Sequence, residues 1–215
     1  MRLVLASNNA KKLAELRLLF APLAIELISQ GVLGVAEAEE PHITFVENAL
    51  AKARHAAAAT GLAAIADDSG LCVDALGGQP GVQSAVYAEL PQQPGSDRET
   101  HRARQDTANN QRLLQALDQV GDRRASFVCA LVALRAADDP EPLIAFGRWN
   151  GRILDRPQGQ GGFGYDPLMA IPALGRSVAE LDAATKNTHS HRALAAAQML
   201  LLLRQAWHLD GATGA

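Results

Sequence analysis

The sequence has no long hydrophobic segment and no secretory leader pattern. Its most apolar stretch, residues 193–203, is interrupted by Gln198 and is too short to span a bilayer. The apolar start of the chain, residues 1–6, is too short for a signal peptide and is followed at once by Asn8 and Asn9. We therefore expect a cytoplasmic protein with no membrane partner.

Positive charge is also scarce. The 215 residues include 20 lysines and arginines against 23 acids, a formal net charge of −3, and no sizeable basic block. Proteins bind nucleic-acid polymers largely by neutralising phosphates, so this balance argues against such a partner. A single nucleotide stays compatible, because it needs only a few well-placed cations.

The chain has only two cysteines, Cys72 and Cys129, each inside an apolar run that is typical of a strand. We expect two buried free thiols in a reducing compartment, and a disulfide between them is the alternative that the sequence leaves open. No cluster of His and Cys suits zinc. The P-loop pattern and a Gly-x-Gly-x-x-Gly turn after a strand are absent, so the common nucleotide motifs do not apply.

What the sequence does contain is the composition of an ordinary globular protein, with 48% hydrophobic and 20% charged residues. Hydrophobic periodicity predicts helices at 13–20, 44–60, 104–117, 177–181 and 189–206, and strands at 3–6, 24–28, 63–66, 71–76, 125–134 and 143–149. Early alternation of strands and helices, followed by a hairpin, predicts an α/β fold with a mixed twisted sheet in two lobes, flanking helices and a central cleft. We expect a single domain over 1–208 and a frayed tail over 209–215.

Two adjacent acids, Asp67 and Asp68, follow an apolar run and precede Ser69, Gly70 and a second apolar run. Adjacent carboxylates repel each other unless a cation or a proton lies between them. The more ordinary interpretation is a turn, in which Asp and Ser side chains bond nearby backbone N–H groups. The sequence therefore predicts a turn between two strands.

The first predicted strand is followed by a short polar turn, Ser7, Asn8 and Asn9, and then by a helix that either asparagine can cap. A helix N-terminus in this position offers backbone N–H groups and a positive dipole end to an anion. Lys11 and Lys12 add charge there. A plain capped helix with two solvated lysines is an equally good interpretation.

Four polar clusters lie at predicted element ends, where ligand sites are commonly built. They are Ser7 to Lys12, Glu39 with Asp68, Phe163 to Asp166, and Lys186 with His191 and Arg192. Lysines and a helix N-terminus suit phosphate, carboxylates suit Mg²⁺, and an aromatic ring on a glycine-flanked loop can stack on a base. The ordinary alternatives are a core position for Phe163 and a solvated helix face for His191 and Arg192.

Six short motifs occur here in the same order as in a known family. They are Ser7-Asn8-Asn9-Ala10-Lys11-Lys12-x-x-Glu15, Thr44-Phe45-x-Glu47-Asn48-Ala49-x-x-Lys52-Ala53, Ala66-Asp67-Asp68-Ser69-Gly70-Leu71, Gly81-x-x-Ser84-Ala85, Gly161-Gly162-Phe163-Gly164-Tyr165-Asp166-Pro167 and Lys186-x-x-x-Ser190-His191-Arg192. Each is weak alone, but the ordered set is highly specific and spans nearly the whole chain. On these motifs the sequence closely resembles the non-canonical purine nucleoside triphosphate pyrophosphatases, the inosine triphosphate pyrophosphatase family.

The resemblance implies a two-lobed mixed-sheet fold, a homodimer, and Mg²⁺-dependent hydrolysis of ITP, dITP and XTP to the monophosphate and pyrophosphate, which cleanses the nucleotide pool. By motif match, Asp68 takes the position of the general base and, with Glu39, that of the metal site. The substrate-binding positions fall on Ser7, Asn8, Asn9, Ala10, Lys11, Lys12, Ser69, Phe163, Gly164, Tyr165, Asp166, Lys186, His191 and Arg192. Lys52 is expected to hold the triphosphate together with Lys12.

One residue departs from the family pattern, because such proteins usually have arginine after Ser84 and Ala85 whereas this chain has Val86. That leaves one phosphate or loop contact open. Two other functions compete with the pyrophosphatase interpretation. A nucleotide-binding module without turnover would not need Asp68, and a metal-dependent phosphomonoesterase would release orthophosphate.

Overall fold

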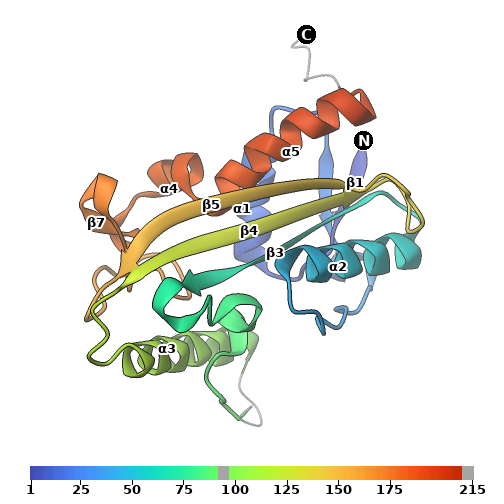
Figure 1. The fold of residues 1–215 in the computed structure, drawn as a ribbon. Helices are drawn as coiled ribbons and strands as arrows, with labels where there is room; N and C mark the ends of the chain where they lie inside the picture. The colour runs from blue at the N-terminus through green and yellow to red at the C-terminus, as the bar shows by residue number, and fades with distance from the viewer. Residues whose placement is uncertain (92–96, 210–215) are drawn as a thin grey trace. The chain divides into compact units, whose positions relative to one another are not determined.

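The computed structural model describes residues 1–91 and 97–209. Its helices are α1 (Ala10–Phe20), α2 (Phe45–Thr60), α3 (Arg98–Ala116), α4 (Ala183–His189) and α5 (His191–Trp207) (Figure 1). Its strands are β1 (Arg2–Leu5), β2 (Glu26–Ser29), β3 (Ala64–Val73), β4 (Arg124–Leu134), β5 (Leu143–Ile153), β6 (Met169–Ile171) and β7 (Arg176–Ser177).

The strands form one seven-stranded sheet in the order β2-β1-β3-β4-β5-β6-β7. β1 pairs in parallel with β2 and β3, whereas β6 pairs antiparallel with β5 and β7. The sheet is therefore mixed, and the predicted α/β class with flanking helices is confirmed.

The chain divides into two compact units. Unit 1 consists of Met1–Asp68, Cys129–Arg148 and the residues from Asn187 on, and unit 2 of Ser69–Val128 and Trp149–Lys186. The long strands β3, β4 and β5 each contribute residues to both units. The predicted single domain over 1–208 and the predicted cleft stay predictions.

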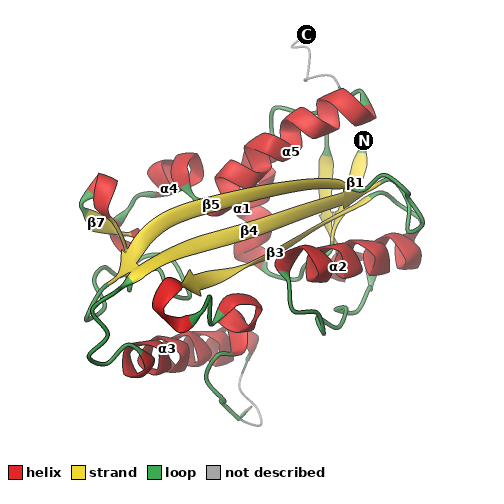
Figure 2. Ribbon diagram, in the orientation of Figure 1, coloured by secondary structure: helices red, strands yellow, loops and turns green. Residues whose placement is uncertain are grey.

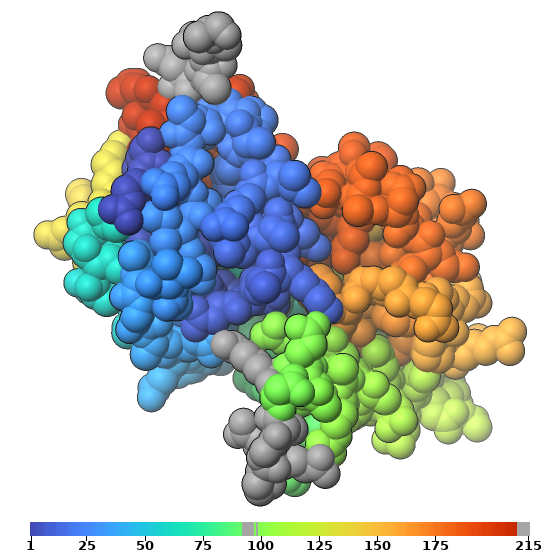
Figure 3. All heavy atoms as spheres, turned by 180° about the vertical axis from the view of Figure 1, so that it is seen from behind, coloured from blue at the N-terminus to red at the C-terminus, as the bar shows by residue number. Residues whose placement is uncertain are grey.

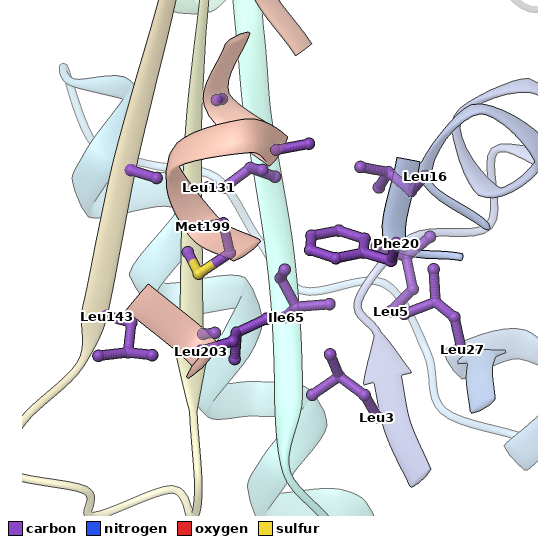
Figure 4. Close-up of a cluster of buried hydrophobic side chains, with 14 of the residues drawn as sticks. Leu3, Leu5, Leu16, Phe20, Leu27, Ile65, Leu131, Leu143, Met199 and Leu203 are labelled. Carbon is purple, nitrogen blue, oxygen red and sulfur yellow. The ribbon is translucent and has the colours of Figure 1, made fainter. Parts of the chain in front are cut away.

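Unit 1 has helices on both faces of its part of the sheet. On one face, α1 and α5 pack over a core in which Phe20 and Met199 lie around Ile65 (Figure 4). On the other face, the alanine-rich side of α2 packs over Ala64 and Ala66. Successive side chains of a strand point to opposite faces, so Ile65 belongs to the first core and its two neighbours to the second.

Unit 2 is built around a core of its own. Leu113 of α3 and Leu117, the C-cap of that helix, pack with Leu71 of β3, Trp149 of β5 and Tyr165 of the glycine-rich loop. Figure 3 shows the green surface of α3 next to the orange segment that contains this loop. The loop is thus anchored in a hydrophobic core by one of its own aromatic residues.

The predicted turn at Asp67 and Asp68 is wrong. Residues 64–73 form a single strand, β3, drawn without interruption in Figure 2, and a 3₁₀ turn, Asp74–Leu76, follows it. The two carboxylates are buried beside cationic side chains of neighbouring helices, and these contacts let the polar residues stay extended. Tertiary charge pairing therefore overrides the local turn preference.

Other expectations concern the thiols and the chain end. Neither cysteine is in a disulfide, as predicted, and Cys129 is buried; Cys72 is partly exposed, so the predicted burial is wrong for that residue. Within the described residues, no helix is long and apolar enough to cross a membrane. Of the predicted frayed tail, 210–215 lie outside the described residues, and Leu209 packs against the α1 and α5 side of the core.

Candidate functional site

The predicted site residues fall into two groups, one in each unit. The group in unit 1 is organised by Asp67 and Asp68 in the middle of β3. Because side chains alternate along a strand, Asp67 lies on the face of Ile65, toward α1 and α5, and Asp68 lies on the face of Ala66, toward α2. The two acids therefore have different partners.

Asp67 is the centre of a buried ion network. Its Oδ2 lies 3.0 Å from Lys12 Nζ of α1 and 3.4 Å from Arg192 Nη2 of α5. The other terminal nitrogen of Arg192, Nη1, bonds the carboxylate of Glu15, which lies one turn after Lys12 on α1. Two helices are thus joined to the strand by two acids and two cations.

These contacts fix the charges of the network. Burial alone would raise the pKa of Asp67, but the charges of Lys12 and Arg192 outweigh it and hold the pKa well below its usual range. Burial alone would lower the pKa of Arg192, but Asp67 and Glu15 raise it above its usual range. Asp67 and Arg192 are therefore both ionised throughout the physiological pH range.

Asp68 has a separate set of partners on α2. Its Oδ1 accepts from Lys52 Nζ at 3.3 Å and its Oδ2 accepts from Asn48 Nδ2 at 3.3 Å. Asn48 and Lys52 are four residues apart, so they lie on one face of the helix. The amide of Asn48 is oriented by the backbone of His42, whose N–H donates to Asn48 Oδ1 at 3.0 Å.

The environment of Asp68 favours its protonated form. Burial raises the pKa of Asp68 to about 6; Lys52 opposes this shift, and the negative charges of Glu40 and Asp67 add to it. Burial alone would lower the pKa of Lys52, but the surrounding acids raise it, so the lysine stays charged. Asp68 is thus a stronger base than an ordinary carboxylate.

The acidic loop before α2 contributes Glu40. Lys52 Nζ lies 2.9 Å from Glu40 Oε2 and 3.3 Å from Asp68 Oδ1. The two carboxylates therefore share the ammonium group of Lys52. The neighbouring Glu39, predicted as a metal ligand, is exposed. No group of three or more His, Cys, Asp or Glu side chains within 1–91 and 97–209 is placed to hold a metal. A site for Mg²⁺ fits, because Mg²⁺ takes one or two carboxylates and completes its shell with water and substrate phosphates.

The predicted phosphate segment is the capped start of α1. Asn9 is the N-cap, and its side chain accepts from the N–H groups of Lys11 and Lys12 at 3.0 and 3.3 Å. Lys11 is exposed, whereas Lys12 turns toward Asp67. The other three members are the partly buried Ser7 and Asn8 and the exposed Ala10.

His191 and Arg192 form the first turn of α5, which is capped by Ser190. Both side chains are buried, so the solvated-face interpretation is wrong. The turn packs directly on β5 at Gly147, where an added Cβ would lie 2.6 Å from the backbone nitrogen of Ala195 and would collide with the backbone of His191. Their contacts with a substrate stay a prediction.

The group in unit 2 lies on the glycine-rich loop 159–167. The carboxylate of Asp166 is buried, and its Oδ2 accepts from the Phe163 N–H at 3.0 Å and from Lys186 Nζ at 2.7 Å. The same ammonium lies 4.7 Å from the centre of the Phe163 ring. Phe163 is half-buried and is held between the loop backbone and a cation.

The remaining predicted residues of unit 2 surround this loop. Tyr165 is buried, and its hydroxyl donates to the carbonyl of Ser84 at 3.0 Å. Burial raises the pKa of Tyr165 above its usual range, so it is a neutral donor. Gly164 has φ +61° and is partly buried. Ser69 is also partly buried. Val86, which stands where the family usually has arginine, is 60% exposed.

Sequence reasoning missed the partners that hold these residues. Asp67, Glu15 and Asn48 all lie in the quoted motifs, yet none was predicted to act in the site. Helical spacing was the available signal for Asn48 with Lys52, four residues apart, and for Glu15 with Lys12, three residues apart. Glu40 had no such signal, because both glutamates of the pair 39–40 fit an acidic loop equally well.

Comparison with known proteins finds a matching family, similar sequences and similar structures. The model of the Ham1 family matches residues 3–201. A protein of Leptothrix cholodnii named dITP/XTP pyrophosphatase is 71% identical and covers 97% of this chain and 100% of its own length, and one of the same name from Methylibium petroleiphilum is 70% identical, with 96% and 99% covered. The structure of a HAM1 protein from Coxiella burnetii superposes with a TM-score of 0.83 at 43% identity, covering 94% of this chain and 98% of that one. The Staphylococcus aureus Ham1 protein gives 0.80 at 35%, with 96% and 100% covered.

Proposed function

Because the chain belongs to the Ham1 family, we propose that it hydrolyses non-canonical purine nucleoside triphosphates, such as dITP, ITP and XTP, to the monophosphate and pyrophosphate. The observation that carries the proposal is the full-length similarity to relatives named dITP/XTP pyrophosphatase. The acids and lysines of unit 1 supply side chains that suit phosphate chemistry.

Asp68 is the proposed general base. A carboxylate that removes a proton from an attacking water works best when its pKa approaches the working pH. Burial brings the pKa of Asp68 to about 6. Asn48 and Lys52 hold its two oxygens, so the carboxylate has a defined orientation before any substrate arrives.

Lys52 and Mg²⁺ are proposed to share the charge of the triphosphate. Asp68, with Glu39 as the family motif implies or Glu40 as the contact with Lys52 favours, would hold the ion. When bound, Mg²⁺ offsets the negative charge on phosphate oxygens and on the leaving pyrophosphate. Lys12, like Lys52, is paired with an acid of β3: its ammonium contacts Asp67, and it can turn to a phosphate only by loosening that pair.

We propose that the loop 159–167 holds the purine base. Phe163 offers a ring face for stacking, and the adjacent pair of Asp166 and Lys186 sets the position of that ring. Hypoxanthine and xanthine have an acceptor oxygen at C6 where adenine has a donor, so a site lined with N–H donors favours them. The homodimer stays a prediction of the family resemblance.

The product of dITP hydrolysis in the presence of Mg²⁺ tests the function. We expect pyrophosphate and dIMP; orthophosphate release would indicate a phosphomonoesterase, and binding without turnover a sensor module. Asp68→Asn keeps the shape of the side chain but removes the base, and it should lower kcat by ~10²–10⁴-fold while nucleotide binding persists.

Substitutions of the neighbouring residues Glu39 and Glu40 test which of them holds the metal. If Glu40 helps to hold Mg²⁺, Glu40→Gln should raise the Mg²⁺ concentration needed for half-maximal activity, and Glu39→Gln should leave it unchanged. The opposite result would return the role to Glu39. If both variants need the same Mg²⁺ concentration as the wild type for half-maximal activity, neither glutamate holds the metal.

A further inference from the structure

Two side chains of helix α3 in unit 2 form hydrogen bonds with Gly164 of the glycine-rich loop. The N–H of Gly164 donates to Asp106 Oδ2 at 2.8 Å, and the carbonyl of Gly164 accepts from Asn110 Nδ2 at 2.9 Å. Asp106 and Asn110 are four residues apart on α3, so their side chains project from the same face of the helix. Both backbone groups of Gly164 are therefore engaged by the same helix.

The same helix also holds a second segment that touches the loop. Asn109 Nδ2 donates to the carbonyls of Ser84 and Ala85, each at 3.1 Å. The Ser84 carbonyl is also the acceptor of the Tyr165 hydroxyl, next to Gly164 in the loop. The attachment of α3 to the loop is thus made directly at Gly164 and indirectly through residues 84–85.

Gly164 has no side chain and adopts φ +61°, a conformation that glycine reaches without strain. Its position can be set only through its backbone groups, which are the groups that α3 engages. The adjacent Phe163 donates its N–H to Asp166 and carries the ring that faces Lys186. Fixing Gly164 therefore fixes the point from which Phe163 projects.

We propose that Asp106 and Asn110 are positioning residues for nucleotide binding, which order the loop 159–167 before the purine nucleotide arrives. The inference rests on the proposed function for the nucleotide, and on the contacts above for the ordering. Each residue that must be ordered during binding lowers affinity roughly five- to thirtyfold. Neither residue lies in the six motifs.

The test compares alanine variants on one helix. Asp106→Ala and Asn110→Ala remove the clamp, and Thr107→Ala is the matched control, because Thr107 is exposed and its hydroxyl bonds only the carbonyl of Ala103 in its own helix among the described contacts. We expect KM for dITP to rise by roughly tenfold or more in the two clamp variants with kcat within about threefold of wild type, because binding is lost equally from ground and transition states. Asp106→Asn, which keeps an acceptor for the Gly164 N–H, should restore most of the affinity.

A second readout is independent of activity. Hydrogen exchange of peptides that cover 159–167 should become at least about tenfold faster in Asp106→Ala and stay unchanged in Thr107→Ala. Unchanged KM and unchanged exchange in both clamp variants would overturn the inference. A fall in kcat without a rise in KM would also overturn it, since that pattern indicates a general structural role. Failure of the wild-type chain to release pyrophosphate from dITP, with faster loop exchange in Asp106→Ala, would instead reject the proposed function.

Discussion

Asp67→Asn removes one charge from the buried network of unit 1 and leaves its shape nearly unchanged. In the native chain, Asp67 is 1% exposed and neutralises Lys12 and Arg192. After the substitution, Arg192 keeps Glu15, but Lys12 faces Arg192 with no acid between them. Breaking a buried pair by removing one partner costs about 3–5 kcal/mol. Lys12 can partly escape, since its side chain is 18% exposed, so we expect the lower end of that range.

The assay is urea or thermal unfolding, with a surface pair as the matched control. Arg123 and Asp155 form an ion pair of 3.1 Å, close to the 3.0 Å of Lys12 and Asp67, but Asp155 is 85% exposed. Asp155→Asn should therefore cost less than about 1 kcal/mol. For a chain of this size, a loss of about 3 kcal/mol in Asp67→Asn lowers Tm by ~6–12 °C.

A double variant separates charge from packing. Adding Lys12→Met to Asp67→Asn removes the stranded cation, so it should recover at least about 1 kcal/mol of the free energy of unfolding. Losses below about 1 kcal/mol in Asp67→Asn, or no recovery in the double variant, would refute the view that burial makes this network stabilising.

Two further outcomes follow from packing and from burial. Gly147→Ala should destabilise the chain by about 1–3 kcal/mol and displace the first turn of α5, because the new Cβ meets backbone atoms, whereas Gly121→Ala, where a Cβ meets nothing within 4 Å, should be neutral or slightly stabilising in the same unfolding assay. Burial raises the pKa of Cys129 to about 12, so only ~10⁻⁴ of it is thiolate at pH 8. Iodoacetamide should therefore alkylate Cys129 only after unfolding, and well behind the partly exposed Cys72, as measured by mass spectrometry. Equal labelling rates of the two cysteines in the folded chain would contradict this.

Local patterns predicted the longer helices and strands of this chain but missed β6, β7 and α4. The cap at Asn9, the α1 and α2 helices, and the β4–β5 hairpin all depend on interactions among residues near each other in sequence, and the structure has them. The turn predicted at Asp67 and Asp68 failed for the opposite reason. What keeps these residues extended is charge from Lys12 and Arg192 beside Asp67 and from Lys52 beside Asp68, and Arg192 is 125 positions away from Asp67 in sequence.

The site shows the same division between local and distant contacts. Residue types that phosphate and metal chemistry require were identifiable one motif at a time. Their supporting contacts were not, because Gly164 lies 58 positions from Asp106 and 54 from Asn110, and no periodicity within either segment indicates that they meet. Periodicity does predict that Asp106 and Asn110 share a helix face, but not what that face contacts.

The alternation of a strand gives the two neighbouring acids different chemical properties. Asp67 lies between two cations, which hold its pKa low and commit it to a permanent negative charge. Asp68, on the opposite face, is more affected by burial and by the acids Glu40 and Asp67 than by the charges of Lys52 and Lys12, and its pKa rises to about 6. Groups whose environments push their pKa values apart take different roles in a reaction. Asp67 is therefore suited to holding α1 and α5 in place and Asp68 to exchanging a proton. Moving the pair by one position along β3 would exchange their faces and so their properties, so the proposed roles of the two acids depend on strand register as much as on the presence of two carboxylates.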